Sequence, residues 1–241
     1  FQTYRAGDAE AATRLAAEVL HDPAADAVDT VRAASLQGLI EQDAGNLQQA
    51  RAYFQRAFAL AHAHALHDDA AAVQCNLGLL ALVEGQLDEA EMLNHKSYRY
   101  FSEMRVPIMM GTIATTLGFI AVIRAQPHEA ATWLHRGITL LTEAQETTYL
   151  LYGLLACSGL ASLRGEPLQA AALLHASSAH AQRVGLQFMP SLLELVQQSV
   201  QRAPAKAGRP VDAATPLQSL EQLVSSTLVW LDAARDAASR N

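Results

Sequence analysis

Hydrophobic residues recur along this chain with the spacing of a helix that buries one face. Four alanines are each followed by a larger residue four positions later and by a small residue three positions after that. The sets are Ala50, Phe54 and Ala57; Ala90, Asn94 and Ser97; Ala130, Leu134 and Gly137; and Ala170, Leu174 and Ser177. This i, i+4, i+7 pattern indicates a buried helical stripe. Because the sequence lacks β-branched runs of alternating polarity, we predict an all-α fold.

The four stripes recur with a period of about 40 residues and without a gap, which indicates an internal repeat. Two further columns keep this spacing: the small residues Gly38, Gly78, Gly118 and Ser158, and the turn residues Gly45, Gly85, Ala125 and Gly165. We interpret each repeat as a pair of helices stacked on its neighbours. The alternative is a generic helix bundle with accidental similarity, which the agreement of several columns over four units disfavours.

Each column has a physical reason. The small residue in the first helix of a pair lets the second helix approach closely, and a Gly at the turn can adopt the left-handed conformation that ends a helix. Pro127 and Pro167 then open the next helix in its first turn, where no N–H is needed. Alanine is frequent and Gly and Pro are few, at 13 and 8 residues, which favours helix throughout.

The predicted domain organisation is one repeat domain over residues 1–202, followed by a linker and one further helix. We expect helices near 27–44 and 47–66, 70–84 and 87–104, 108–124 and 127–144, and 148–164 and 167–184. The repeat units are therefore near 27–66, 70–104, 108–144 and 148–184, with a partial unit at 1–21 and an extra helix at 190–202. The Pro-, Ala- and Gly-rich segment 203–215 is the predicted linker. The last helix, 216–237, either caps the repeat array or binds a partner, and we favour the cap.

These columns resemble the tetratricopeptide signature, although two aromatic columns of that family are missing. Ala34, Gln74, Ala114 and Leu154 stand where a Trp is common, and Glu41, Ala81, Ala121 and Ala161 stand where a Tyr is common. The period is also longer than the roughly 34 residues of that family. The resemblance implies a right-handed superhelical solenoid.

Long Ala- and Leu-rich repeats of this kind resemble those of MalT-like bacterial transcriptional regulators, which are large ATPases that often carry a LuxR-type DNA-binding domain. Leu160–Ser177 looks like the closing repeat of such proteins, and Ser219–Val224 looks like a short helix that follows it. The resemblance implies a ligand-sensing and protein-interaction domain. The alternative is a free-standing tetratricopeptide scaffold that binds a partner protein or peptide and has no transcriptional role.

The family resemblance places the binding groove on the first helix of each pair, at fixed offsets from its small residue. The predicted ligand- or partner-binding residues are Arg32, Ser35, Leu39, Gln42, Asp43, Cys75, Leu79, Leu82, Val83, Thr112, Thr115, Phe119, Val122, Tyr152 and Leu155. The middle of this groove is apolar. Either the solenoid is wound tightly enough to cover these residues, or a small effector, a partner protein or a second copy of the chain covers them.

The formal net charge of −7, with Lys96 and Lys206 the only lysines, argues against direct contact with nucleic acid. The uncharged stretch Ile108 to Ile123 is too short for a membrane span and falls on the repeat, so we expect a buried helix and no membrane contact. The chain starts at Phe1 with no initiator Met or apolar leader, and we expect it to be part of a longer protein.

Candidate chemistry is sparse. Cys75 and Cys157 show no spacing motif, so we expect free buried thiols in a cytoplasmic protein, with a disulfide as the alternative. His62, His64 and His67 form the densest group of potential metal ligands, but the spacing favours a solvated helix end. Neither a phosphate-binding loop nor a nucleophile elbow is present. We therefore predict no catalytic site, no metal and no cofactor.

Overall fold

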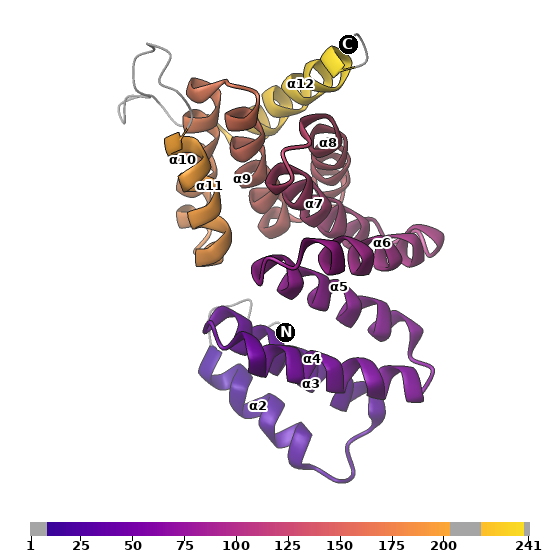
Figure 1. The fold of residues 1–241 in the computed structure, drawn as a ribbon. Helices are drawn as coiled ribbons and strands as arrows, with labels where there is room; N and C mark the ends of the chain where they lie inside the picture. The colour runs from indigo at the N-terminus through magenta and orange to yellow at the C-terminus, as the bar shows by residue number, and fades with distance from the viewer. Residues whose placement is uncertain (1–8, 203–217, 239–241) are drawn as a thin grey trace. The chain divides into compact units, whose positions relative to one another are not determined.

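A computed structural model describes residues 9–202 and 218–238, and these residues form eleven α-helices with no β-strand among them (Figure 1). The helices are α2 (Ala9–His21), α3 (Ala27–Asp43), α4 (Leu47–Ala63), α5 (His67–Val83), α6 (Leu87–Glu103), α7 (Pro107–Ile123), α8 (Pro127–Glu143), α9 (Thr147–Leu163), α10 (Pro167–Arg183), α11 (Pro190–Arg202) and α12 (Leu220–Ala238). The predicted all-α class is confirmed. The predicted linker at 203–215 lies outside the described residues.

The backbone repeats with half of the period found in the sequence. Helices α3 to α10 all contain 17 residues, and their first residues are evenly spaced from Ala27 to Pro167. Their bounds differ from the predicted ones by at most three residues. Two successive helices therefore make one repeat unit, as in a helical-repeat solenoid.

Left-handed residues at the turns enforce this regularity. Positive φ values occur with the same even spacing at Gly45, Ala65, Gly85, Arg105, Ala125, Gln145, Gly165 and Gly185. Each follows the capping residue of a helix, where the left-handed conformation allows a Schellman motif. At the first turn, the Asn46 N–H donates to the Glu41 carbonyl at 2.8 Å and the Gly45 N–H donates to the Gln42 carbonyl at 3.0 Å. Four of the eight residues carry a side chain despite the steric cost of this conformation.

The chain forms two compact units, residues 1–103 and 104–241. In unit 1, the close approach predicted at the small residue of each first helix is confirmed at both helix pairs. A Cβ atom added to Gly38 would lie 2.5 Å from the ring of Phe54, and one added to Gly78 would lie 2.3 Å from the side chain of Asn94. A larger residue at either glycine would therefore force the paired helices apart. Phe54 is fully buried in the core of this unit.

Charged and polar side chains also connect the helices of unit 1. Arg51 on α4 donates to Glu84, to Gln86 at 2.7 Å and to Glu89 at 3.1 Å, around the turn between α5 and α6. The hydrogen bond to Glu84 contributes most to raising the pKa of Arg51 above its ordinary value. This charge-assisted group of contacts ties the first helix pair to the second.

Unit 2 uses the same small-to-large packing. A Cβ atom on Gly118 of α7 would lie 2.4 Å from Leu134 of α8, and one on Gly111 would lie 2.7 Å from Leu141. Ser158, the small residue of α9, is fully buried. None of the helices in residues 9–202 and 218–238 has the length and hydropathy needed to cross a bilayer.

The last two helices of unit 2 pack on different partners. Helix α11 lies mainly against α9, whereas α12 lies mainly against α8. In the middle of α12, Trp230 donates its Nε1–H to Glu166 at 2.7 Å, and the Arg164 guanidinium lies 5.8 Å from the Trp230 ring centroid. The structure thus places α12 along a helix of the third repeat unit. Its predicted role as a cap of the array stays a prediction.

Candidate partner-binding face

The structure distributes the fifteen predicted groove residues over three environments. Eight are buried: Ser35, Gln42, Cys75, Leu82, Thr115, Phe119, Val122 and Leu155. Five are half-buried, namely Leu39, Leu79, Val83, Thr112 and Tyr152, and two are exposed, Arg32 and Asp43. They therefore do not line one uniformly accessible groove. The accessible ones lie mainly on α3 and α5 of unit 1, and their role in binding stays a prediction.

In unit 2, close packing of α9 against α7 covers much of the predicted lining. A Cβ atom on Gly159 of α9 would lie 2.9 Å from Val122 Cγ1, so the two helices meet where the glycine leaves room. The Thr115 hydroxyl would lie 2.8 Å from a Cβ on Gly137 and 3.5 Å from one on Gly153. Thr115 is thus enclosed by its neighbouring helices, and the alternative of tight packing applies to this part of the predicted groove.

The predicted lining of α9 is covered in turn by the segment that leads into α11. The Met189 N–H donates to the Tyr152 hydroxyl at 2.9 Å. The Phe188 ring meets the Tyr152 ring edge-on, with centroids 5.0 Å apart. Val196 of α11 also lies near Gly159, with its Cγ2 3.9 Å from the position that a Cβ would take. Leu155 is therefore a core residue of unit 2, and the half-buried Tyr152 is held by contacts within the same unit.

In unit 1, by contrast, α3 and α5 present an accessible face with polar links between the helices. The Arg32 Nε–H donates to Asp69 Oδ1 at 3.2 Å, and the Asn76 amide donates to the Ser35 hydroxyl at 3.1 Å. We define the α3–α5 face by its accessible residues, which are Arg32, Leu39 and Asp43 on α3 and Asp69, Asn76, Leu79 and Val83 on α5. It combines apolar side chains with hydrogen-bonding groups.

Two members of the α3–α5 face, Asp69 and Asn76, were not among the predicted residues. They lie fourteen and seven positions before Val83, so all three share one side of α5. That spacing is visible in the sequence. It was missed because the offsets of the tetratricopeptide groove, counted from Gly78, do not include these two positions.

Carboxylates gather at the N-terminal ends of α3 and α5. Asp29 lies in the first turn of α3, and Asp68 and Asp69 lie in the first turn of α5. Asp26 caps α3, because its Oδ1 accepts a hydrogen bond from the Asp29 N–H at 2.7 Å. The Tyr100 hydroxyl donates to Asp68, and this hydrogen bond is the main reason that the pKa of Tyr100 rises to about 12. This end of the face is therefore strongly acidic.

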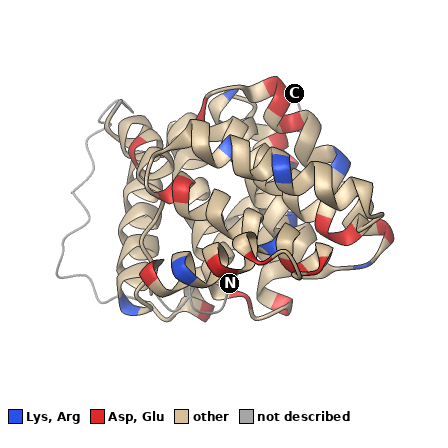
Figure 2. Ribbon diagram, turned by 90° about the horizontal axis from the view of Figure 1, so that it is seen from below, with Lys and Arg blue, Asp and Glu red and all other residues tan. Residues whose placement is uncertain are grey.

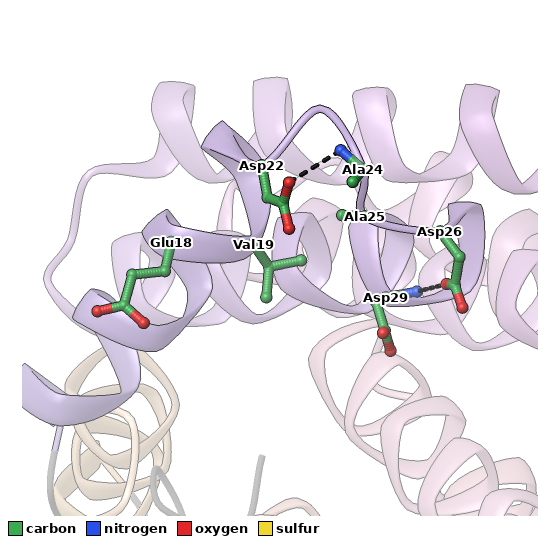
Figure 3. A pocket seen from close by; sticks show the side chains of 7 residues that line it. All are labelled: Glu18, Val19, Asp22, Ala24, Ala25, Asp26 and Asp29. Carbon is green, nitrogen blue, oxygen red and sulfur yellow. Dashed lines mark hydrogen bonds between the residues drawn. The ribbon is translucent and has the colours of Figure 1, made fainter.

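A hollow of about 490 Å³ lies between the end of α2 and the start of α3 (Figure 3). Its lining residues are Glu18, Val19, Asp22, Ala24, Ala25, Asp26 and Asp29. Asp29 belongs to this hollow and lies three residues before Arg32, on the same side of α3. The hollow therefore adjoins the acidic end of the α3–α5 face.

The two cysteines are free and buried, one in each unit. Burial raises the pKa of the Cys75 thiol to about 12 and also raises that of Cys157, which keeps both thiols protonated and unreactive near neutral pH. His62, His64 and His67 are all exposed around the turn between α4 and α5. Within residues 9–202 and 218–238, the structure groups no three His, Cys, Asp or Glu side chains that could hold a metal ion.

The fold and this face define a helical-repeat protein with one accessible, mixed apolar and polar surface in unit 1. Comparison with known protein families and with curated proteins gives no match. Among solved structures, the chain is similar to that of BtubC (BKLC) from P. vanneervenii, with a TM-score of 0.56 and 14% sequence identity. The similarity covers 90% of this chain and 82% of that one. At this identity, the likeness concerns the fold.

Proposed function

We propose that this chain is a protein-interaction module and that the α3–α5 face binds a peptide segment of a partner protein. The observation that carries the proposal is the difference in accessibility between equivalent helices. Leu39 and Leu79 are half-buried beside polar groups on α3 and α5, whereas Phe119, at the equivalent position of α7, is buried. Accessible apolar residues rimmed by polar ones are typical of interaction sites.

A peptide suits the shape of this face better than a small molecule does. Small-molecule sites are concave and enclose most of their ligand. The α3–α5 face instead extends along two helices, and Arg32 and Asp43 are separated by eleven residues of α3, or about 16 Å of helix. An extended segment of about five residues spans that length. Its backbone could hydrogen-bond to Asn76 while its side chains pack on Leu79.

The finer assignment that we propose is a tetratricopeptide-type repeat. The support comes from the small residue of each first helix, the large residue opposite it and the left-handed turn, all of which occupy their expected places in the fold. Other buried residues fill the core at the positions where the family commonly has Trp. Ala34, Ala114 and Leu154 are fully buried where the family commonly has Trp, so the longer helices pack without it.

The proposal is tested by selecting peptides from a display library on the whole chain. Selected peptides should bind the wild-type protein and lose most of their affinity for Leu79→Glu, which places a charge in the middle of the α3–α5 face. Met92→Glu on α6 is a matched control, because Met92 is also exposed and lies outside the face. Peptides that bind Leu79→Glu as well as the wild type, or a selection that gives no binder, would refute the proposal.

A second candidate function, the sensor domain of a signal-responsive transcriptional regulator, is favoured by the resemblance of Leu160–Ser177 and Ser219–Val224 to MalT-like proteins. In that case, partner or effector binding would shift the arrangement of an attached ATPase or DNA-binding module. The test is the sequence of the complete gene. A Gly-x4-Gly-Lys-Ser/Thr loop or a helix-turn-helix encoded in the same reading frame supports this candidate, and a complete frame without either contradicts it.

A further inference from the structure

The net negative charge of this protein is concentrated in one unit. Residues 1–103 contain 15 acidic and 7 basic residues, whereas residues 104–241 contain 9 acidic and 10 basic residues. The formal charges are therefore −8 and +1. Figure 2 shows where the acidic and basic residues lie on the helices. A field of one sign favours partners of the opposite sign and speeds their association.

Helix dipoles explain only part of this acidic character. Asp29, Asp68 and Asp69 lie in first turns, where a negative charge stabilises the helix. Glu18 and Asp22 lie at the opposite end of α2, where the dipole disfavours a carboxylate. A charge that opposes the local stability of its helix indicates a role other than stability.

These unfavourable carboxylates adjoin the α3–α5 face. Glu18 and Asp22 line the same hollow as Asp29, and their side chains are drawn together in Figure 3. Asp22 accepts a hydrogen bond from the Ala24 N–H at 2.8 Å. Among the described residues, the carboxylates of Glu18 and Asp29 accept no hydrogen bond and form no ion pair. Both side chains are exposed, so they are available to a cationic partner.

We propose that the partner segment is a peptide with basic residues at one end and apolar residues at the other. This inference rests on the proposed function of the α3–α5 face and follows from charge complementarity. The basic side chains pair with Glu18, Asp22 and Asp29 at the acidic end, and the apolar side chains pack on Leu39 and Leu79.

The dimensions of α3 set the spacing within the peptide. Asp29 and Leu39 lie ten residues apart on the helix, which corresponds to about 15 Å at 1.5 Å per residue. An extended peptide advances about 3.3 Å per residue, so the basic and apolar side chains are separated by about four to five residues.

The experiment measures binding of fluorescein-labelled peptides of about twelve residues to the whole chain by fluorescence anisotropy. The first peptide carries two Lys and two Leu, with about five residues between the pairs, which is the spacing that the face dictates. The second replaces both Lys by Glu, and the third replaces both Leu by Ser. The Lys–Leu peptide should bind most tightly, and added salt should weaken its binding because the contacts are exposed.

The protein variant Glu18→Gln with Asp22→Asn removes two charges while retaining the acceptor oxygen that bonds to Ala24. Its affinity for the Lys–Leu peptide should fall by about three- to ten-fold, as expected for two exposed ion pairs. Its melting temperature should not fall, because both carboxylates oppose the dipole of α2. Glu10→Gln with Glu103→Gln removes the same charge from exposed positions outside the hollow and should leave the affinity unchanged.

Three outcomes would overturn this inference. The Glu peptide could bind as tightly as the Lys peptide, the Ser peptide could bind as tightly as the Leu peptide, or the two double variants could lose affinity equally. In each case, the proposed function stands if library-selected peptides still depend on Leu79. If selection on the wild-type chain gives no binder, the proposed function itself fails, so the two failures are distinguishable.

Discussion

The α3–α5 pair in unit 1 and the α7–α9 pair in unit 2 share a backbone period but differ in what their facing sides expose. In α9, Gly159 lies so close to Val122 of α7 that a Cβ atom added to the glycine would be 2.9 Å from Val122 Cγ1. In α5, the equivalent position is Leu79, which is half-buried. At this position Leu39 and Leu79 of unit 1 are half-buried, whereas Phe119 and Gly159 of unit 2 are buried, so the first helices of unit 2 leave less of this side accessible.

Polar side chains reinforce the same difference. Asn76 of α5 donates to Ser35 of α3, whereas the equivalent residue two repeats later, Ala156 of α9, is fully buried. A buried alanine needs no hydrogen-bond partner and allows apolar packing, while the asparagine and its partner remain near water. The sequence of each repeat thus determines whether the same pair of helices packs through apolar contacts or keeps polar groups near water.

The largest expected effect on stability comes from replacing Gly159 of unit 2 by leucine, the residue at the equivalent position 79 of unit 1. Gly159→Leu forces a side chain into the contact with Val122 and should lower the free energy of unfolding by about 3 kcal/mol, at the upper end of the cost of overpacking. Urea unfolding followed by fluorescence measures it, because Trp133 and Trp230 both lie in unit 2.

The control for this prediction is a double-mutant cycle with Val122→Ala. If the contact is responsible, the added space should recover part of the lost stability. A Gly159→Leu protein as stable as the wild type would show that α7 and α9 are not closely packed.

Exchanging the equivalent residues Asn76 and Ala156 should lower the free energy of unfolding by unequal amounts. Ala156→Asn buries an amide without a partner and should cost about 2 kcal/mol. Asn76→Ala removes one half-buried hydrogen bond and should cost about 1 kcal/mol. Urea unfolding followed by circular dichroism compares them, with Ala59→Asn at an exposed helical position as the control. Equal costs would contradict the difference in burial between α5 and α9.

Because both thiols are buried, we expect both units to lose stability at alkaline pH. The pKa of Cys75 is about 12 in the folded chain, whereas thiols in unfolded chains ionise near pH 8.5, so unfolding releases protons above that pH. Stability is therefore complete below about pH 8.5 and falls towards about pH 12, by at most about 1.4 kcal/mol per pH unit for each thiol.

Denaturation at about pH 8 and about pH 10 tests this dependence. The decrease in the free energy of unfolding per pH unit should be smaller in Cys75→Ala and in Cys157→Ala than in the wild type. An unchanged slope in both variants would show that the thiols are accessible to water in the folded protein.

The smallest expected effect concerns the turns. Ala125 has a φ of 54° where other units have a glycine, so Ala125→Gly should raise the free energy of unfolding by about 0.5–1 kcal/mol. Gly165→Ala is the reciprocal change and should lower it by a similar amount, since a Cβ there meets no atom within 4 Å and only the backbone conformation is affected. Thermal unfolding of both variants gives the comparison, and effects of the same sign would contradict it.

The helices and their pairing could be predicted from the sequence because local signals mark them. The repeat columns marked small residues such as Gly118 as points of close approach, and in the structure Gly118 meets Leu134 of the paired helix. The exact half-period of the backbone had no column of its own in the sequence, because Ala65, Arg105 and Gln145 occupy left-handed positions where a glycine would have signalled a turn. Their conformation is imposed by the helices on either side.

The candidate site was predicted only in part, because accessibility depends on how closely neighbouring helices pack. The offsets identified Leu39 and Leu79 correctly as accessible positions but treated Phe119 and Leu155 in the same way, although these are buried. No local signal showed that the segment around Phe188 would cover Tyr152. At the position equivalent to Leu79, a glycine such as Gly159 is a sequence feature that indicates close packing in advance.

Hydroxyl-radical footprinting of the whole chain, with and without the Lys–Leu peptide, tests most directly whether the α3–α5 face binds the partner segment. Leu39 and Leu79 should be labelled in the free protein and become protected when the peptide binds. Phe119 and Leu155 should be protected in both states because unit 2 buries them. Labelling of Phe119 that disappears on peptide binding, with no change at Leu79, would contradict the assignment of the partner-binding face to α3 and α5.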